Sequence, residues 1–227
     1  MVRVRAHIRD GSPVRAHNRS SPRTGKVAAA AVAMALFAGG GGVVGGGALG
    51  SSAGGAAQST LARNLGAKKV DAKNSAKRGD TKKAWRRMGL RSLREHAERY
   101  AECVVHSKGQ VQQFLTRTPC RRLDRMLVAL ADGSGNVTVI AISWVEFRGK
   151  TAAKRYRGLS DDYGTGYIRP IAGAVLAMAD VELTGQHYAS RLANRVAVTA
   201  EAEPVTGQFD DRVLDAIAEV AAWIPRR

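Results

Sequence analysis

The chain has 227 residues, of which 36 are Lys or Arg and 19 are Asp or Glu, so its net charge at pH 7 is +17. Residues 1–100 contain 20 basic and 5 acidic residues, whereas residues 101–227 contain 16 and 14. The near-neutral second part argues against a nucleic-acid-binding domain, whose basic footprint normally lies on a folded face.

An uncharged, apolar segment spans residues 27–50 and follows a basic leader at residues 1–26. A membrane-spanning helix needs about 20 predominantly apolar residues. The first half of the segment is rich in alanine, but eight of the twelve residues in 39–50 are glycine, and each glycine weakens a helix by about 1 kcal/mol. We expect an uncleaved signal anchor that contacts the lipid bilayer, with the leader in the cytoplasm, or a cleaved signal peptide and a secreted protein. Both place the C-terminal part outside the cytoplasm.

Residues 51–89 are first rich in Ala, Gly and Ser and then rich in Lys and Arg. A segment with so little apolar material is predicted to be a disordered linker. Its basic residues could also attach to anionic lipid head groups or to an acidic cell-wall polymer, at about 1 kcal/mol for each residue near a charged surface. The same residues oppose translocation, so the charge of the leader must outweigh them if the segment at 27–50 is an anchor.

The remaining residues, 90–227, are enough for one domain with a modest core. Apolar residues recur at helical spacing from Leu90 to Val104 and predict a helix there. Ser107 and Gln110 have the spacing of a capping box, so a second helix is expected to begin there and to end before Pro119.

The clearest strand signal is a hairpin formed by residues 125–131 and 137–147 around the turn at 132–136. Both faces of its second strand are apolar, which predicts a central strand covered on two sides. A helix at 149–159, a strand at 175–183, a second hairpin at 186–203 and a last helix capped by Asp210 complete the pattern. The expected fold is a single α+β domain with an antiparallel sheet of four to five strands and three to four helices.

The chain contains two cysteines, Cys103 and Cys120. In an exported domain such a pair most simply forms one disulfide. A catalytic thiol would need a neighbouring base, and the proximity of His106 to Cys103 in the sequence is weak support for one.

The most polar and aromatic run of the domain spans residues 184–191 and contains His187, Tyr188 and Arg191. We predict a ligand-binding site at these three residues, with Asp161 and Asp162 of a turn-rich loop as further candidates. Ser190 offers a nucleophile for a Ser/His/Asp hydrolase on paper. However, no Gly-x-Ser-x-Gly motif surrounds it, and strand alternation would place it on the opposite face from His187.

No motif predicts a metal or cofactor. The loop from Asp161 to Gly166 lacks the alternating acidic residues and closing Glu of a calcium loop. Gly133 to Gly135 is too short for a phosphate loop, and two cysteines with scattered histidines do not have zinc spacing.

Several short motifs together resemble uncharacterised exported proteins of high-GC actinobacteria. They are the runs at 103–106, 114–120, 164–166, 184–191 and 214–218. The resemblance would cover roughly residues 90–227, and it implies export and the paired cysteines but no activity.

The leading hypothesis is therefore a membrane-anchored, extracytoplasmic, non-enzymatic binding module. The alternatives are a hydrolase acting on envelope material and a nucleic-acid-binding protein that acts through its basic tails.

Overall fold

The computed structural model describes residues 2–4, 7–9, 12–14, 17–19, 62, 64–176 and 181–226. The apolar segment at 27–50 and most of residues 51–63 lie outside the described residues. Near the N-terminus, β1 (Val2–Val4) pairs with β4 (His17–Arg19), and β2 (His7–Arg9) pairs with β3 (Ser12–Val14). Within the described residues, no helix has the length and apolar character needed to cross a bilayer.

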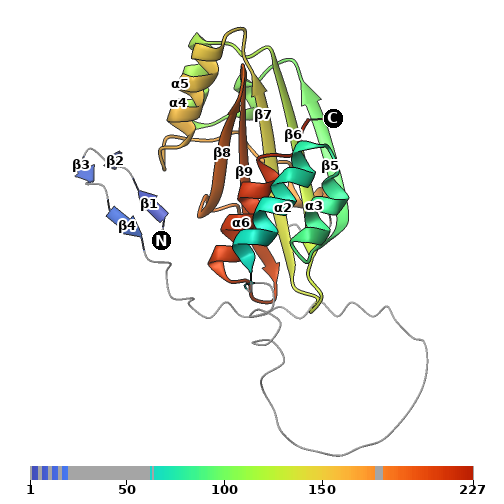
Figure 1. Ribbon diagram of the computed structural model, residues 1–227. Coiled ribbons are helices and arrows are strands. Elements are labelled where there is room, and N and C mark those ends of the chain that lie inside the picture. Colours follow the sequence, from blue (N-terminus) through green and yellow to red (C-terminus); the bar gives the residue numbers. More distant parts are fainter. Residues whose placement is uncertain are drawn as a thin grey trace, which may run out of the picture.

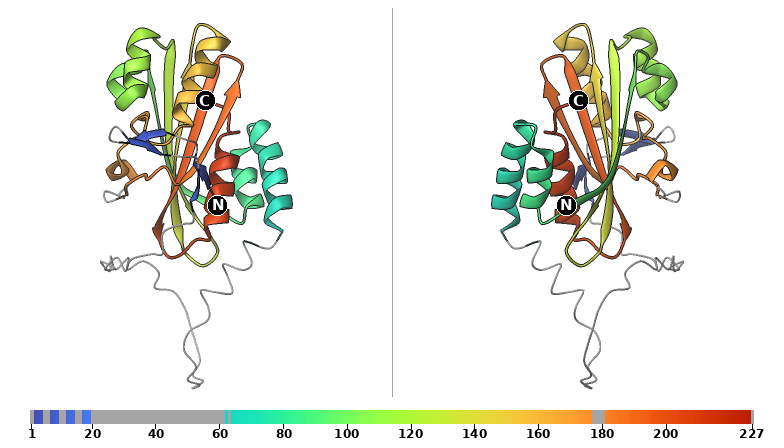
Figure 2. Two further views of the ribbon diagram at one scale, coloured as in Figure 1. Left: turned by 90° about the vertical axis from the view of Figure 1, so that its left-hand side faces the viewer. Right: turned by 90° about the vertical axis from the view of Figure 1, so that its right-hand side faces the viewer.

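The domain is built on one antiparallel sheet of five strands in the order β5-β6-β7-β9-β8. The strands are β5 (Arg91–Tyr100), β6 (Arg122–Ala131), β7 (Val137–Glu146), β8 (His187–Ala193) and β9 (Val196–Thr206). Helices α2 (Leu65–Lys77), α3 (Thr81–Arg87) and α6 (Asp211–Ala221) cover one face, which we call the α6 face (Figures 1 and 2). Helices α4 (Gly109–Arg117) and α5 (Lys150–Ser160) lie on the other, the α5 face, and two short 3₁₀ turns, η1 (Val104–His106) and η2 (Gly173–Leu176), belong to the connecting loops.

The expected mixture of helices with an antiparallel sheet is confirmed, with five strands and with five α-helices in the described residues rather than three or four. Strand β7 is central, as predicted. Ile140 and Ile142 pack into the core under α6, while Val139 and Val145 pack on the α5 face. Both hairpins, α5 and the Asp210 cap of α6 also form where the sequence predicted them.

The prediction of a disordered linker is wrong for residues 65–89, which form α2 and α3. Ala72, Ala76, Trp85 and Met88 are buried in the same core as α6. The side that packs against the core consists of small residues of α2 together with Trp85 and Met88, while Val70 of α2 is exposed. The segment therefore folds despite its polar composition. The folded domain therefore begins no later than Leu65.

The helix predicted from Leu90 to Val104 is instead the edge strand β5 followed by η1. Leu93, which was expected on an apolar helix face, is 38% exposed. The many charged side chains of β5 suit an edge strand, because they discourage pairing with other chains. The strand predicted at 175–183 is also not observed: residues 173–176 form η2, and residues 177–180 lie outside the described residues.

Helix α4 forms as predicted, but without the capping box. The Ser107 hydroxyl donates to the carbonyl oxygen of Val104, and Lys108 occupies the cap position. The first amides of α4 donate instead to the carbonyl oxygen of Thr165. The start of α4 is therefore tied to the loop that follows α5.

Candidate functional site

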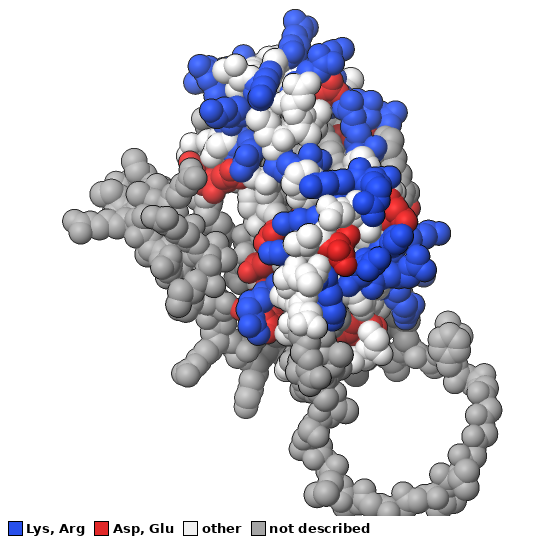
Figure 3. Space-filling model, viewed as in Figure 1, with Lys and Arg blue, Asp and Glu red and all other residues white. Residues whose placement is uncertain are grey.

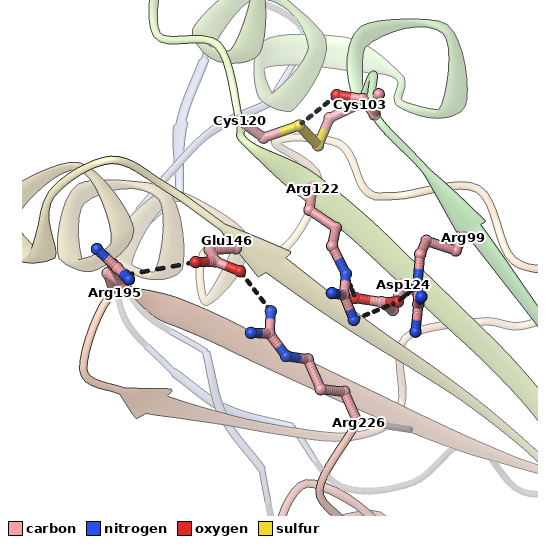
Figure 4. A network of polar contacts seen from close by, with 9 residues as sticks. Arg99, Cys103, Cys120, Arg122, Asp124, Glu146, Arg195 and Arg226 are labelled. Atoms are coloured by element: carbon pink, nitrogen blue, oxygen red, sulfur yellow. Dashed lines mark hydrogen bonds and ion pairs between the residues drawn. A yellow bond between two sulfur atoms is a disulfide. The ribbon is translucent and has the colours of Figure 1, made fainter.

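The predicted disulfide is present. Cys103 and Cys120 are bonded, with their Cα atoms 6.1 Å apart, and they join the end of β5 to the start of β6 (Figure 4). Neither cysteine is free, so the domain has no thiol nucleophile. The role of the pair is structural.

The predicted ligand residues of β8 do not form one site, because strand alternation divides them between the two faces. His187 and Arg191 point to α6, whereas the hydroxyl of Tyr188 donates to Asp161 at the end of α5. Ser190 also donates to Asp161. Ser190 and His187 therefore lie on opposite faces, as alternation predicted, and do not form a nucleophile–base pair.

His187 is 7% exposed and contacts two carboxylates of α6. Its Nδ1 lies 2.9 Å from Asp215, and its Nε2 lies 3.7 Å from Asp211. Burial works to lower the pKa of His187, but the hydrogen bond and charge of Asp215 and the charge of Asp211 together raise it. His187 thus acts as an ionic link between β8 and α6.

Arg191 has a similar structural role. Its Nε donates to the carbonyl oxygen of Ala222, and its guanidinium lies 4.5 Å from the ring centroid of Trp223. Burial lowers the pKa of Arg191. The side chain therefore fastens the end of α6 to β8 and is not available to a ligand.

A row of polar residues crosses the α5 face of the sheet. The strand register aligns one residue from each strand, in the order Glu98, Arg125, Ser143, Thr199 and Ser190. The rows on either side contribute to two separate apolar clusters. This polar row is therefore a gap in an otherwise apolar face, and such a gap is a natural place for a polar ligand.

Arg125 is the anchor of this row. One guanidinium nitrogen donates to Glu98 at 2.6 Å, and another donates to the carbonyl oxygen of Arg169 at 2.6 Å. A loop at residues 166–170 is thereby held above the sheet. Backbone bonds from Lys108 to Tyr167 and from Gln110 to Thr165 hold the same loop from the side of α4.

A cavity of about 50 Å³ lies beneath this loop. Its floor includes Ser143, Thr199 and Glu201 from β7 and β9, and its walls include Tyr188 and Ser160. Of the predicted site residues, Tyr188 alone lines it, while Asp161 contacts Tyr188 from outside. Asp162 does not line the cavity either; its carbonyl oxygen accepts the Thr165 hydroxyl.

Glu201 is the functional candidate that the sequence did not reveal. Burial raises its pKa to about 7, although a hydrogen bond from the Gly185 amide works in the opposite direction. The neighbouring Thr184 hydroxyl donates to Glu203 at 2.9 Å. Two carboxylates of β9 therefore hold the segment that forms one side of the cavity.

An arginine network occupies the end of the α6 face that no helix covers. Asp124 lies between Arg99 and Arg122, with Nε–O distances of 2.9 and 2.6 Å (Figure 4). Glu146 lies in the same way between Arg195 and Arg226. Hydrogen bonding from Arg226 lowers the pKa of Glu146, with burial working against it. The four guanidiniums exceed the two carboxylates, so the network is cationic.

The basic run of the predicted linker is also part of the folded surface. Residues 65–89 contain nine Lys or Arg and two Asp, and we call α2 and α3 together the basic helical pair. Figure 3 shows Lys and Arg over these helices and also at the end of the domain where α4 and α5 lie in Figure 1. Residues 65–227 contain 28 basic and 18 acidic residues. The expectation that the folded domain is close to neutral is therefore wrong.

Within the described part of the chain, no group of three or more His, Cys, Asp or Glu residues is placed to hold a metal ion. Comparison with known proteins identifies no matching family model, no matching curated protein and no matching solved structure. The cavity around Glu201 and the basic surface formed by α2 and α3 are therefore the two candidate functional features of the domain.

Proposed function

We propose that this protein is a membrane-anchored, extracytoplasmic and non-enzymatic interaction module, and that the basic helical pair holds its domain against anionic lipid head groups. The proposal is supported by the folding of nine Lys and Arg within residues 65–89, four of them on α2, four on α3, and Arg78 between the two helices. Folded helices present these charges at fixed positions on one surface, unlike a disordered tether.

The position of the basic helical pair in the chain supports this proposal. Helix α2 begins at Leu65, 15 residues after the apolar segment at 27–50 ends. Fifteen extended residues span at most about 50 Å, so an anchored chain would keep α2 near the bilayer surface. Each Lys or Arg near an anionic surface contributes about 1 kcal/mol to binding.

Several of these charges are available to a partner. Lys69 and Lys73 pair with Glu219, and Arg87 pairs with Asp71. Four others form no ion pair with any side chain in the described part of the domain, namely Arg78, Lys82, Lys83 and Arg86. Together they would contribute about 4 kcal/mol at low ionic strength.

The small cavity supports a binding role more than a catalytic one. Its volume of about 50 Å³ is well below the roughly 300–1,000 Å³ of typical small-molecule sites. The separation of Ser190 from His187 by the sheet also removes the arrangement on which the hydrolase hypothesis depended.

The test uses the full chain in lipid nanodiscs that contain either zwitterionic or anionic lipid. Val70 on α2 is 56% exposed, and both native cysteines are paired, so Val70→Cys supplies one reactive thiol for a fluorescent donor. With an acceptor dye in the lipid, we expect energy transfer to be high in anionic nanodiscs, low in zwitterionic ones and reduced by salt.

Two variants with equal charge loss make this test specific. Replacing Arg78, Lys82, Lys83 and Arg86 by Gln should abolish the transfer that depends on anionic lipid. Replacing Arg148, Lys150, Lys154 and Arg155, which are exposed at the α5 end, should preserve it. Equal losses in both variants would indicate unspecific attraction to polyanions, including nucleic acids, and would contradict the proposal.

Cell fractionation with thiol labelling tests the location separately. A membrane-bound chain whose cysteines react only after reduction is the expected result. Release into the medium would show that the signal is cleaved and the protein secreted. Freely reactive cysteines in a soluble cytoplasmic fraction would contradict both locations.

A further inference from the structure

The charged side chains that line the cavity on the α5 face are of one sign only. Its lining includes one carboxylate, that of Glu201, and no Lys, Arg or His. The remaining polar groups are hydroxyls, and aromatic rings are contributed by Tyr156, Tyr167 and Tyr188. Carboxylates, hydroxyl oxygens and the faces of aromatic rings all attract positive charge.

Two groups at the cavity lack the partners that burial normally demands. The Ser160 hydroxyl oxygen is buried and has no hydrogen-bond partner. The Glu201 carboxylate receives a hydrogen bond from the Gly185 amide, and no cation pairs with it in the described structure. Glu201 is partly buried, and a carboxylate that is removed from water without a counter-ion is costly. The raised pKa of Glu201 reflects that cost.

We propose that this cavity binds the ammonium group of a small primary amine, with Glu201 as its counter-ion and the surrounding hydroxyls as hydrogen-bond acceptors. An ammonium group has three donors. The carboxylate of Glu201 and nearby hydroxyls such as those of Ser143 and Thr199 can receive them.

The size of the cavity limits the ligand. A volume of about 50 Å³ is a few times the roughly 10–15 Å³ that a cavity needs to hold one water, so it accommodates a group of a few heavy atoms, such as methylammonium. Tyr167 lines the cavity and is 51% exposed, so the cavity reaches the surface there. A longer amine would therefore insert its charged end and leave the remainder in solvent.

Other ligand classes fit the lining less well. An anion would meet a carboxylate and no cationic side chain. A divalent metal ion would need several oxygen ligands with more than one carboxylate, and Glu203 is not among the lining residues. The potassium ion resembles ammonium in size, so the experiment below compares the binding of potassium with that of methylammonium.

Binding should depend on pH because it requires the ionised form of Glu201. The charged and titratable groups around it are Glu203 on β9, His187 and Tyr188 on β8, and Asp161 and Tyr156 at α5. Glu203 raises and His187 lowers the pKa of Glu201. Since that pKa is about 7, the apparent affinity for an ammonium group should fall about tenfold between pH 8 and pH 6.

The experiment titrates the detergent-solubilised full chain with methylammonium, using calorimetry and the ¹³C signal of the Glu201 carboxyl carbon. We expect saturable binding at pH 8 and a midpoint of carboxyl titration that moves to lower pH. Methanol, which has a similar size but no charge, should do neither. Potassium that binds as well as methylammonium would overturn the assignment of an ammonium site.

Glu201→Gln keeps the size of the side chain and removes its charge, so binding should weaken at least tenfold. Glu102→Gln, which changes an exposed glutamate that does not line the cavity, is the matched control and should bind within twofold of the wild type. If Glu201→Gln fails to fold, the shift of the wild-type carboxyl titration still decides the question. Methylammonium that leaves this titration unmoved would show that the cavity holds water alone and would overturn the proposal.

Discussion

Gly109 and Gly166 pack directly against each other where two loops cross. A β-carbon on either glycine would lie 3.0 Å from the Cα atom of the other. A β-carbon on Gly166 would also collide with the carbonyl oxygen of Lys108, and the φ of Gly166 is +113°. This crossing joins the start of α4 to the loop over the Glu201 cavity, so the cavity depends on two positions without side chains.

We therefore expect Gly166→Ala to destabilise the domain by about 2–4 kcal/mol, because the new methyl group meets rigid backbone and the φ value is strained for alanine. The midpoint temperature of thermal unfolding should fall by about 2–4 °C for each kcal/mol of lost stability. Gly164→Ala is the matched control in the same loop. Its φ is +86°, but its β-carbon would have nothing within 4 Å, so its cost should be about 1 kcal/mol. Equal costs for the two variants would mean that the loop crossing does not hold the fold.

The stability of a Trp85→Ala variant tests whether α3 belongs to the folded domain. Its side chain is 1% exposed within the core under α6, and removing a buried Trp costs about 3–5 kcal/mol. Trp85→Ala should therefore lower stability by that amount in chemical denaturation. Val70→Ala on the exposed side of α2 should change it by less than about 0.5 kcal/mol. A Trp85→Ala variant as stable as the wild type would restore the linker interpretation of residues 65–89.

The sequence predicts the elements whose signals are local. The first hairpin has β-forming residues on both sides of a Gly-rich turn, and α6 has a wide apolar face behind the Asp210 cap. The disulfide was predicted from two cysteines in a chain expected to be exported, and the structure contains it. In these cases neighbouring residues alone determine the structure.

The helices α2 and α3 were missed because their buried side consists largely of alanines together with Trp85 and Met88. A short alanine side chain gives a weak signal of a buried helix face. The many basic residues made the segment look like a polar linker. Strand β5 was missed for a related reason. As an edge strand it is mostly exposed, so its polar residues lack the alternation that marks a half-buried strand.

The candidate site was least predictable. Glu201 and Glu203 resemble the exposed residues of an alternating strand, and their local sequence contains no sign of burial. Glu201 is enclosed by the loop at 166–170 and the segment at 183–185, which join it only in the folded chain. Conversely, His187 and Arg191 suggested a ligand site because they are polar, whereas they bind α6.

The ion pair of His187 should make stability depend on pH. The pKa of His187 is raised in the folded domain above its ordinary value of 6.5. Its stabilising effect is therefore complete below the unfolded pKa and is lost as the pH rises through the folded pKa. We expect His187→Gln to cost about 1 kcal/mol more at pH 5 than at pH 9, measured by urea denaturation.

His106 supplies the contrasting control. Burial and the charge of Arg125 lower its pKa, so the folded domain favours its neutral form. The contribution of His106 to stability should therefore increase with rising pH, whereas that of His187 decreases. His106→Gln should remove the first of these two trends. The same trend in both variants would indicate a general effect of net charge rather than of these two sites.

Glu201 should reduce the stability of the domain at neutral and higher pH. Its pKa rises from 4.5 to about 7 on folding, so stability is lost as the pH rises through this interval, because the folded state must ionise a partly buried carboxyl. A shift of this size corresponds to about 3 kcal/mol. Glu201→Gln should therefore be more stable than the wild type by about that amount at pH 8, and nearly equal to it at pH 4. Thermal unfolding at both pH values measures the difference, with Glu102→Gln, which changes an exposed glutamate away from the cavity, as the control that should show no gain. A gain for Glu201→Gln that is the same at both pH values would indicate improved packing and not relief from a buried charge. A gain confined to high pH would show that the chain keeps a destabilising carboxylate in this cavity, as expected of a residue retained to bind a ligand.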